Sequence, residues 1–330
     1  MDITADTFLT TVYVTVDEFC ARHRPLLHTG PKPVMSDSEV LTILLLKAWH
    51  GTSERGVLAW IAQTYAAYFP HLLSPSAFNR RARALAPMMS DLLHALAEKL
   101  AVWEEPYEII DGLPIPLASP PRGQHRRCFD QDEADIGRSS SGKDWYYGVS
   151  LLGCVTASGV MTGFVTTPAN CGERWAATAL FSWRADPTAP PIEIEQTART
   201  RQPSHRPVGP RGHHLSPTTA GPIVTGMYLA DRNFTGTAWQ DAWTTTCGAT
   251  VITQDHLAVR DRHWFHDARQ RIETVFAVLT SVLHIKYPRA RSEQGLITHV
   301  VSTCAALNLG IYINRMYGRR DLQHGTLFRG

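Results

Sequence analysis

Two aspartates each follow a short apolar run that is typical of a β-strand. Asp111 comes after Ile109-Ile110, and Asp231 comes after Tyr228-Leu229-Ala230. Strands disfavour aspartate, and burial of a lone charge is costly, so an acid at such a position needs a reason. If the two strands are parallel neighbours, their backbones lie about 4.8 Å apart and both carboxylates can reach one cation. Helix caps or salt bridges are the alternative explanation for such residues.

A third acid, Glu273, lies on a helix that the sequence predicts near the C-terminus. The apolar stripe of this helix has a helical period and consists of Phe265, Ala268, Ile272, Val275, Phe276, Leu279 and Leu283. A polar seam runs along one edge of the stripe and contains His266, Arg269, Glu273 and Thr280. We therefore expect Glu273 where the helix meets the sheet, although a glutamate on an amphipathic helix is commonly a surface charge.

The elements that would position these acids follow from the periodicity of residues 105–316. Strands are predicted at residues 107–112, 145–152, 160–166, 223–230 and 249–253, and helices at 173–183, 237–246, 264–284 and 293–314. Residues 184–222 contain eight prolines and are predicted to form an irregular insertion. The order predicts a mixed α/β layer that begins with an antiparallel meander.

The first 104 residues have a helical pattern instead. Ser36 and Glu39 form a capping-box signature before an apolar helix, and Ser53 and the Ser74-Pro75 pair mark two further helix starts. The third of these helices carries Arg80 and Arg81. Short helices with an arginine face predict a helix-turn-helix-like DNA-binding domain over residues 1–104, and ordinary packing with surface arginines is the alternative.

The overall charge hides an asymmetry. The chain has 32 basic and 30 acidic residues, a formal charge of +2, which excludes a histone-like protein. Residues 260–330, however, hold eleven basic residues against five acidic ones, and this segment includes a short basic tail over residues 317–330. Further clusters are Arg199, Arg201, Arg206 and Arg211, and Arg122, His125, Arg126 and Arg127. Such clusters indicate either contact with a polyanion or a solvated basic face.

Several features favour a soluble, cytoplasmic protein. The N-terminus has no basic segment followed by an apolar one, and the longest apolar run, Val40 to Leu46, is too short to span a membrane. The six cysteines are scattered without a Cys-x-x-Cys pair, which predicts free buried thiols. The dispersed histidines do not predict a metal site.

Five ordered segments give the chain a specific resemblance. They are Ile109-Ile110-Asp111-Gly112-Leu113-Pro114-Ile115-Pro116, Gly142-Lys143-Asp144-Trp145-Tyr146-Tyr147-Gly148, Pro168-Ala169-Asn170, Leu229-Ala230-Asp231 and Arg271-Ile272-Glu273-Thr274-Val275-Phe276. In this order they resemble a bacterial insertion-sequence transposase with a ribonuclease-H-like DDE domain, and the similarity covers residues 36–316. The resemblance implies that the strands of Asp111 and Asp231 are adjacent and parallel.

The resemblance also implies the chemistry. Asp111, Asp231 and Glu273 would be the catalytic carboxylates and would bind two Mg²⁺ or Mn²⁺ ions, which prefer hard oxygen ligands. Such ions, roughly 3.5–4 Å apart, activate a water and later a DNA 3′-hydroxyl for in-line displacement at a phosphodiester. Arg269, Arg271, Lys286, Arg289 and Arg291 would contact DNA together with Arg80 and Arg81, with a structural ion pair as the alternative role of Arg269.

The sequence thus predicts a transposase that cuts and joins transposon-end DNA. It would act as a homodimer on double-stranded ends and target DNA, in the bacterial cytoplasm and at the nucleoid when bound to DNA. Two positions depart from the family pattern: Arg232-Asn233-Phe234 follows the second aspartate, and Ser150 stands where a basic residue is common. The alternatives are a nuclease of the same fold without strand transfer, and a catalytically inactive DNA-binding regulator.

Overall fold

The structure is a computed structural model, and it describes residues 3–23, 33–118, 129–130, 133–138, 145–194 and 219–327. The chain divides into two compact units. Unit 1 consists of residues 1–100, 277–290 and 294–330, and unit 2 consists of residues 101–276 and 291–293. The carboxylates singled out from the sequence all belong to unit 2, so each unit is described by itself.

The N-terminal part of unit 1 is helical, as predicted. Its helices are α1 (Ala5–His23), α2 (Asp37–His50), α3 (Glu54–Thr64), α4 (Pro75–Ala84) and α5 (Ala86–Lys99). All three predicted starts are confirmed, because the side chains of Ser36, Ser53 and Ser74 each accept the backbone N–H three residues later. The capping box of Ser36 and Glu39 is complete.

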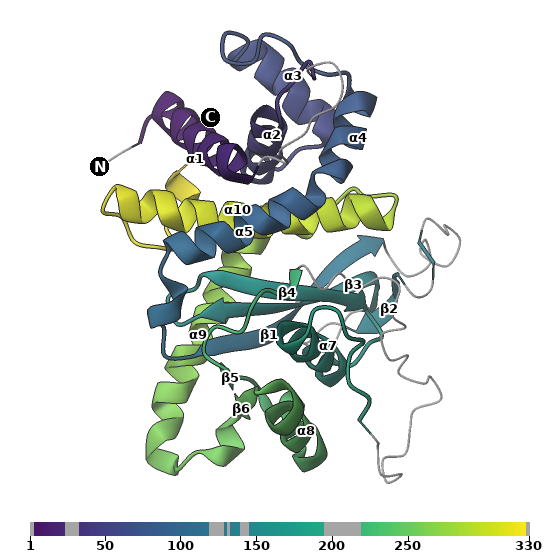
Figure 1. The fold of residues 1–330 in the computed structure, drawn as a ribbon, viewed down its shortest axis with the longest axis vertical. Helices are drawn as coiled ribbons and strands as arrows, with labels where there is room; N and C mark the ends of the chain where they lie inside the picture. Colours follow the sequence, from purple (N-terminus) through teal and green to yellow (C-terminus); the bar gives the residue numbers. More distant parts are fainter. Residues whose placement is uncertain are drawn as a thin grey trace. The chain divides into compact units, whose positions relative to one another are not determined.

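Unit 1 also contains α10 (Glu293–Met316) from residue 294 onward, together with the segment 277–290. Figure 1 shows α10 beside α5, and side chains tie α10 to that helix: Asn308 donates to the carbonyl of Leu93 at 3.3 Å and Arg315 to that of Leu100 at 3.0 Å. The division therefore differs from the predicted one, which placed residues 105–316 in one domain. Since α10 is apolar on nearly every side, its sequence pattern did not reveal its packing partner.

Among the described residues one helix, α10, is long and apolar enough to cross a membrane. In its most apolar window, however, 89% of the residues are buried inside the protein. Such burial is typical of the core helix of a soluble protein.

Unit 2 is built on a mixed sheet. The described strands are β1 (Glu108–Ala118), β2 (Asp135–Arg138), β3 (Trp145–Thr156), β4 (Met161–Pro168), β5 (Met227–Leu229) and β6 (Thr250–Ile252). Along the sheet the order is β2-β3-β1-β5-β6, and β4 pairs with β3 beyond the stretch that β2 occupies. The pairs of β3 with β1, β2 and β4 are antiparallel, and β1-β5 and β5-β6 are parallel. The predicted mixed layer with a leading meander is confirmed.

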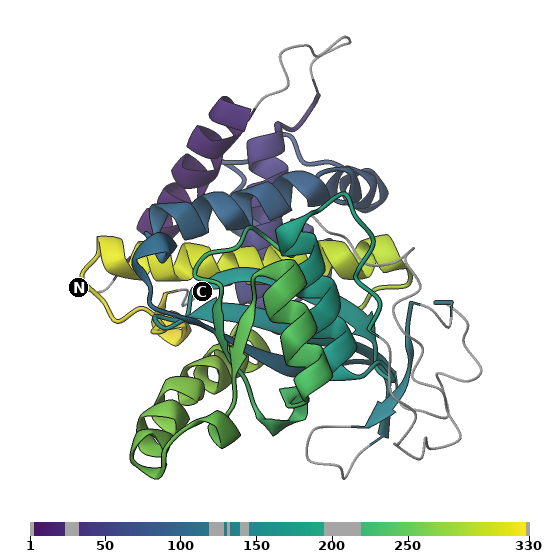
Figure 2. The same ribbon diagram turned by 60° about the horizontal axis from the view of Figure 1, so that its bottom comes forward.

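Helices α7 (Glu173–Ala185) and α8 (Thr237–Cys247) lie side by side over one face of this sheet (Figure 2). Trp243 of α8 packs edge-on against Phe181 of α7, with ring centroids 5.4 Å apart, and donates its indole N–H to Thr178 at 2.9 Å. Together with the inward side chains of the strands they form a continuous apolar core. The part of α9 (Arg262–Ser281) that belongs to unit 2 contacts the sheet at Gly153, where a Cβ would lie 3.1 Å from the ring of Phe276.

The strand lengths differ from the prediction in two respects. Strand β1 does not stop at Gly112 but continues to Ala118, because β3 pairs with it along that whole length. Strands β5 and β6 have three residues each, shorter than expected. Most of the proline-rich insertion, residues 195–218, lies outside the described residues, as do the arginines from Arg199 to Arg211 and the segment 119–128.

Burial of the cysteines is as predicted in the described part of the chain. Cys20, Cys154, Cys171, Cys247 and Cys304 are all free and buried, and Cys128 lies outside the described residues. Burial raises the pKa of the Cys154 and Cys304 thiols. A thiol that resists ionisation is a poor nucleophile, so these cysteines serve packing.

Candidate active site

Asp111 and Asp231 come together because β1 and β5 are parallel neighbours. Ile109 pairs with Leu229 in the register of these strands, and each aspartate follows its strand's paired residue by two positions. Strand β5 ends at Leu229, whereas β1 runs on, so Asp111 lies inside β1 at the level where its parallel neighbour stops. The two strands are therefore adjacent and parallel, as a common site for both carboxylates requires.

The carboxylate of Asp111 is held by two donors. Arg269 of α9 donates to its Oδ2 at 3.0 Å, and the backbone N–H of Gly112 donates to its Oδ1 at 2.8 Å. Both side chains of the Asp111–Arg269 pair are 20% exposed. Burial raises the pKa of Asp111, the charges of Asp231 and Glu273 raise it further, and Arg269 and Gly112 oppose the shift. One arginine thus compensates only part of the negative charge at this place.

A fourth acid, Glu173, belongs to the same cluster and was not predicted. It is the first residue of α7, and a Cβ at Gly112 would lie 2.7 Å from its Oε1, so the glycine gives this carboxylate its room. Burial raises the pKa of Glu173 to about 7, with further contributions from the charges of Asp231 and Asp111. No strand-end position marks Glu173 in the sequence, because its place depends on how α7 packs on the sheet.

Asn233 connects two of these acids. Its backbone N–H donates to Oδ1 of Asp231 at 2.8 Å, and its side-chain amide donates to Oε2 of Glu173 at 3.1 Å. Arg174 in turn donates to the carbonyl of Asn233 at 2.7 Å. Asn233, which follows Asp231 by two positions, thus orients two carboxylates of the cluster.

Glu273 lies on α9 one turn after Arg269, as its spacing requires. Its side chain is exposed, so the expectation that it lies at the contact between helix and sheet is wrong. The buried side chains of α9 in this region belong to Ile272, Val275 and Phe276, so Glu273 lies beside the buried stripe of the helix and not within it. Its charge nevertheless acts on Asp111, which places it at the solvent side of the cluster.

The donor set fits a hard divalent cation in its chemistry. Carboxylate oxygens are the ligands that Mg²⁺ and Mn²⁺ prefer. The four acids Asp111, Glu173, Asp231 and Glu273 have Arg269 as their common positive neighbour, which balances only one of their negative charges. Among the described residues, no three acidic, histidine or cysteine side chains form a ready-made metal site. In this arrangement Asp111 is engaged by Arg269, and Glu173 by Asn233.

The predicted DNA-contacting residues lie in both units. In unit 2, Arg269 pairs with Asp111, and Arg271 and Arg291 are exposed. In unit 1, Arg80 and Arg289 are exposed, Lys286 is half-buried, and Arg81 pairs with Asp37 of α2. The pair between Arg81 and Asp37 fixes α4 to α2, which is a structural role for Arg81.

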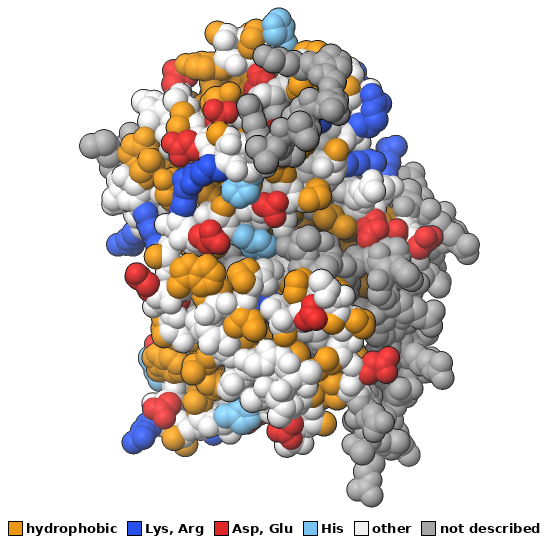
Figure 3. Space-filling view, in the orientation of Figure 1, with side chains coloured by type: hydrophobic (Ala, Val, Ile, Leu, Met, Phe, Trp, Pro, Cys, Tyr) orange, Lys and Arg blue, Asp and Glu red, His pale blue; other side chains and the backbone are white. Residues whose placement is uncertain are grey.

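The described surface is mixed in charge on the face that Figure 3 presents. Acidic and basic side chains alternate there and form no continuous field of one sign among the described residues. The arginine clusters between residues 122 and 127 and between 199 and 211 lie outside the described residues, and so does Lys143. Ser150 is half-buried within β3, opposite Pro114 of β1 and Thr167 of β4.

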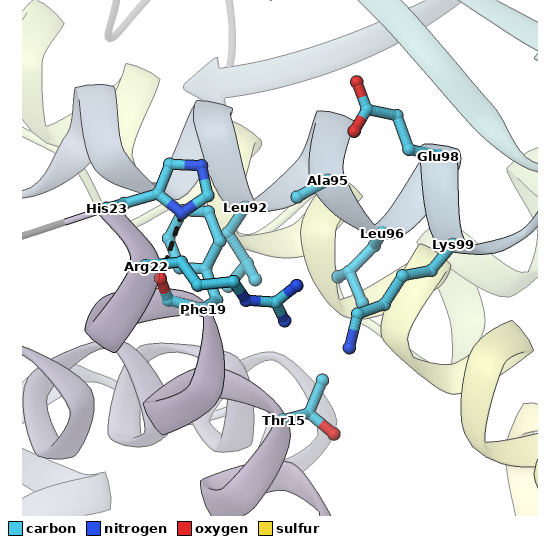
Figure 4. Close-up of a pocket in the computed structure, with 9 residues that line it drawn as sticks. All are labelled: Thr15, Phe19, Arg22, His23, Leu92, Ala95, Leu96, Glu98 and Lys99. Atoms are coloured by element: carbon cyan, nitrogen blue, oxygen red, sulfur yellow. Dashed lines mark hydrogen bonds between the residues drawn. The ribbon is translucent and has the colours of Figure 1, made fainter.

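A cavity of about 130 Å³ lies in unit 1 between α1 and α5 (Figure 4). Phe19, Leu92 and Leu96 give it apolar walls, and Arg22 and Lys99 lie at its edge. None of its lining residues is a predicted site residue. Its chemistry is that of an apolar gap between two helices.

The raised pKa of Glu173 predicts how stability depends on pH in protein freed of divalent metal. Because the folded protein holds this proton up to about pH 7 and the unfolded chain releases it near pH 4.5, stability falls as pH rises between these values. We expect Glu173→Gln to unfold at nearly the same temperature as the wild type at pH 5 and at a higher temperature at pH 8.

Thermal unfolding followed by circular dichroism in a chelating buffer measures this difference. The exposed Glu104→Gln in the same unit is the matched control and should follow the wild type at both pH values. A difference between Glu173→Gln and wild type that is the same at pH 5 and pH 8 would show that Glu173 does not titrate in this range.

Comparisons with known proteins add no assignment: no family model, no curated protein and no solved structure was found to match the chain.

Proposed function

We propose that the protein is a metal-dependent DNA transposase of the DDE type, which cleaves transposon-end DNA and joins it to a target. The observation that carries the proposal is the parallel pairing of β1 with β5, which brings Asp111 and Asp231 to one place. The charges of Asp231, Glu273 and Arg269 all act on Asp111. A group of acids with one arginine is typical of sites that bind divalent cations. The ribonuclease-H-like identity of the sheet is part of the same proposal.

In this proposal Asp111, Asp231 and Glu273 hold the metal ions. Bound Mg²⁺ would supply Lewis-acid stabilisation of the charge that develops on the phosphodiester oxygens. Glu173 lies beside these acids and is the alternative to Glu273 as third ligand, because it is less exposed and its charge couples to both aspartates.

Arg269 has a second function in the proposal. Its Nη2 donates to Asp111, while its Nε is buried and has no hydrogen-bond partner among the described residues. A buried guanidinium nitrogen without an acceptor is costly, and a phosphate oxygen is a suitable acceptor. We therefore assign Arg269 to the binding of a DNA phosphate next to the metal-binding acids.

The remaining parts of the proposal concern the binding partners and the cellular location of the protein. The helical unit would bind the terminal repeats, and two copies of the chain would bring two DNA ends together as a homodimer. The protein would work in the cytoplasm, at the nucleoid when bound to DNA.

The test uses the purified full chain and a linear duplex that contains the DNA flanking its gene. We expect nicks at the element ends and strand-joined products with Mg²⁺ or Mn²⁺, and neither with Ca²⁺ or with a chelator, measured on denaturing gels. Nicking without joining would identify a nuclease, and binding without cleavage would identify a DNA-binding regulator. Absence of both binding and cleavage would refute the proposal.

A further inference from the structure

A basic cluster in unit 1 lies outside the candidate active site. Lys47 is on the last turn of α2, and His284 and Arg289 are in the connection between α9 and α10, within the part of it that belongs to unit 1. The ring of His284 lies directly on the C-terminus of α2, since a Cβ at Gly51 would be 2.5 Å from its Cδ2 and Nε2. Gly51 is the cap of α2 and donates its N–H to the carbonyl of Lys47 at 3.0 Å.

The charges of this cluster act on one another. Burial lowers the pKa of Lys47, and Arg289 lowers it further, whereas Glu54 raises it. Burial also lowers the pKa of His284, with Arg289 and His50 as further causes. The charge of Arg289 therefore acts on both Lys47 and His284 and disfavours their protonated forms.

No acidic side chain in the described part of the chain forms an ion pair with this cluster. Among the described residues, the side chains of Lys47, His284 and Arg289 form no ion pair and no hydrogen bond. The charge of Glu54 favours the ionised form of Lys47, but its carboxylate accepts the side-chain amide of Asn79 at 2.6 Å and forms no ion pair with Lys47. The C-terminal end of α2 offers only about half a negative charge, which is less than two permanent cations require.

The backbone holds two of these residues in an uncommon conformation. His284 and Arg289 have φ values of 56° and 51°, in the left-handed region that residues other than glycine adopt at a cost. The buried ring of His299 contacts the carbonyl of Ile285 at 3.0 Å and anchors the segment between them. Two residues of one short connection thus have a strained backbone, and one of them, His284, places its imidazole on the C-terminus of α2.

We propose that Lys47, His284 and Arg289 form a binding site for a phosphate group on unit 1. Phosphate oxygens accept hydrogen bonds from ammonium, imidazole and guanidinium groups, and the negative charge supplies the missing counter-ion. Lys47 and His284 are half-buried and Arg289 is exposed, so the site is open to a large molecule. Resting on the proposed function, we assign the phosphate to the backbone of DNA, which extends the predicted role of Arg289 to Lys47 and His284.

The first experiment uses inorganic phosphate as the probe and the full chain as the protein. We expect millimolar phosphate to raise the unfolding midpoint of the wild type by a few degrees relative to chloride at equal ionic strength. Lys47→Met should unfold at a higher temperature than the wild type without phosphate, because it removes a charge that burial and Arg289 both disfavour, and should not respond to phosphate. Lys99→Met, at another lysine of unit 1, is the matched control and should respond as the wild type does.

The second experiment identifies the source of the phosphate. For duplex DNA, the slope of log K against log salt should be smaller by about 0.9 in Lys47→Met and in Arg289→Asn, which removes the charge but tolerates the left-handed backbone. A normal phosphate response of Lys47→Met would overturn the site. A lost phosphate response with an unchanged DNA slope would overturn the assignment to DNA and leave the phosphate site, whereas absence of DNA binding by the wild type would refute the proposed function itself.

Discussion

Asp111→Asn and Asp231→Asn are each expected to lower metal-dependent DNA cleavage by about three orders of magnitude. Each variant keeps the shape of the side chain but removes the anionic oxygen that a Mg²⁺ ion prefers. A loss of about 4 kcal/mol of transition-state stabilisation, the scale expected for a catalytic metal, corresponds to about 10³-fold in rate. Initial rates of nicking of end-containing DNA, at saturating Mg²⁺, measure the effect.

Controls separate loss of chemistry from loss of structure. Asp241→Asn, on the exposed face of α8 in the same unit, should cleave at the wild-type rate. Since burial and neighbouring acids disfavour the charge of Asp111, Asp111→Asn should remain folded even though Arg269 loses its ionised partner. Cleavage by either aspartate variant at close to the wild-type rate would refute the assignment of both the site and the function.

The same assay decides which glutamate completes the site. We expect Glu273→Gln to lose as much activity as the aspartate variants and Glu173→Gln to lose less, because Oε2 of Glu173 already accepts the amide of Asn233. The opposite order would make Glu173 the third ligand. Such a result would also fit its smaller exposure and its coupling to both aspartates.

Arg184→Met is expected to destabilise the protein by about 3–5 kcal/mol, the scale for removing one partner of a buried ion pair. Arg184 of α7 and Glu108 of β1 form such a pair, at 2.9 Å and with both side chains 0% exposed. Thr162 and the Tyr228 hydroxyl complete the hydrogen bonds of this group. Without Arg184, the carboxylate of Glu108 is left buried in the core beneath α7.

The midpoint and slope of urea unfolding in a chelating buffer measure this loss. Arg232→Met removes an arginine from an exposed pair with Asp255 and should cost at most about 1 kcal/mol. The double variant Glu108→Leu with Arg184→Met should recover much of the stability, because no charge is then left alone. An effect of Arg184→Met no larger than that of Arg232→Met would show that the buried pair contributes no more to stability than an exposed pair does.

The local structure of the chain could be predicted from its sequence. The capping serines of α2, α3 and α4 lie where their spacing indicated, and β3 and β4 form an antiparallel pair, as the predicted meander requires. Caps, turns and apolar periodicity are properties of neighbouring residues, so a single sequence contains them. The apolar stripe of α9 was predicted for the same reason, and Phe265, Ile272 and Leu279 are buried.

Groups that are far apart in the chain could be predicted only in part. Asp111 and Asp231 were found because each ends an apolar run, but their common place required the parallel pairing of β1 and β5. Glu173, the pair of Glu108 with Arg184, and the cluster of Lys47 with His284 gave no signal. Each of these consists of an ordinary polar residue whose partner comes from a distant segment.

The sequence by itself therefore determined the kinds of element and their order, the two aspartates, and the basic bias of the last 71 residues. The tertiary structure decided that Glu273 faces solvent, that Glu173 joins the aspartates, and that α10 packs with the N-terminal helices. The physical reason is that the periodicity of apolar residues indicates which side of a helix or strand is buried but not which other element covers that side. The charge that a buried acid or lysine feels depends on those partners, and they are set by the packing of the whole chain.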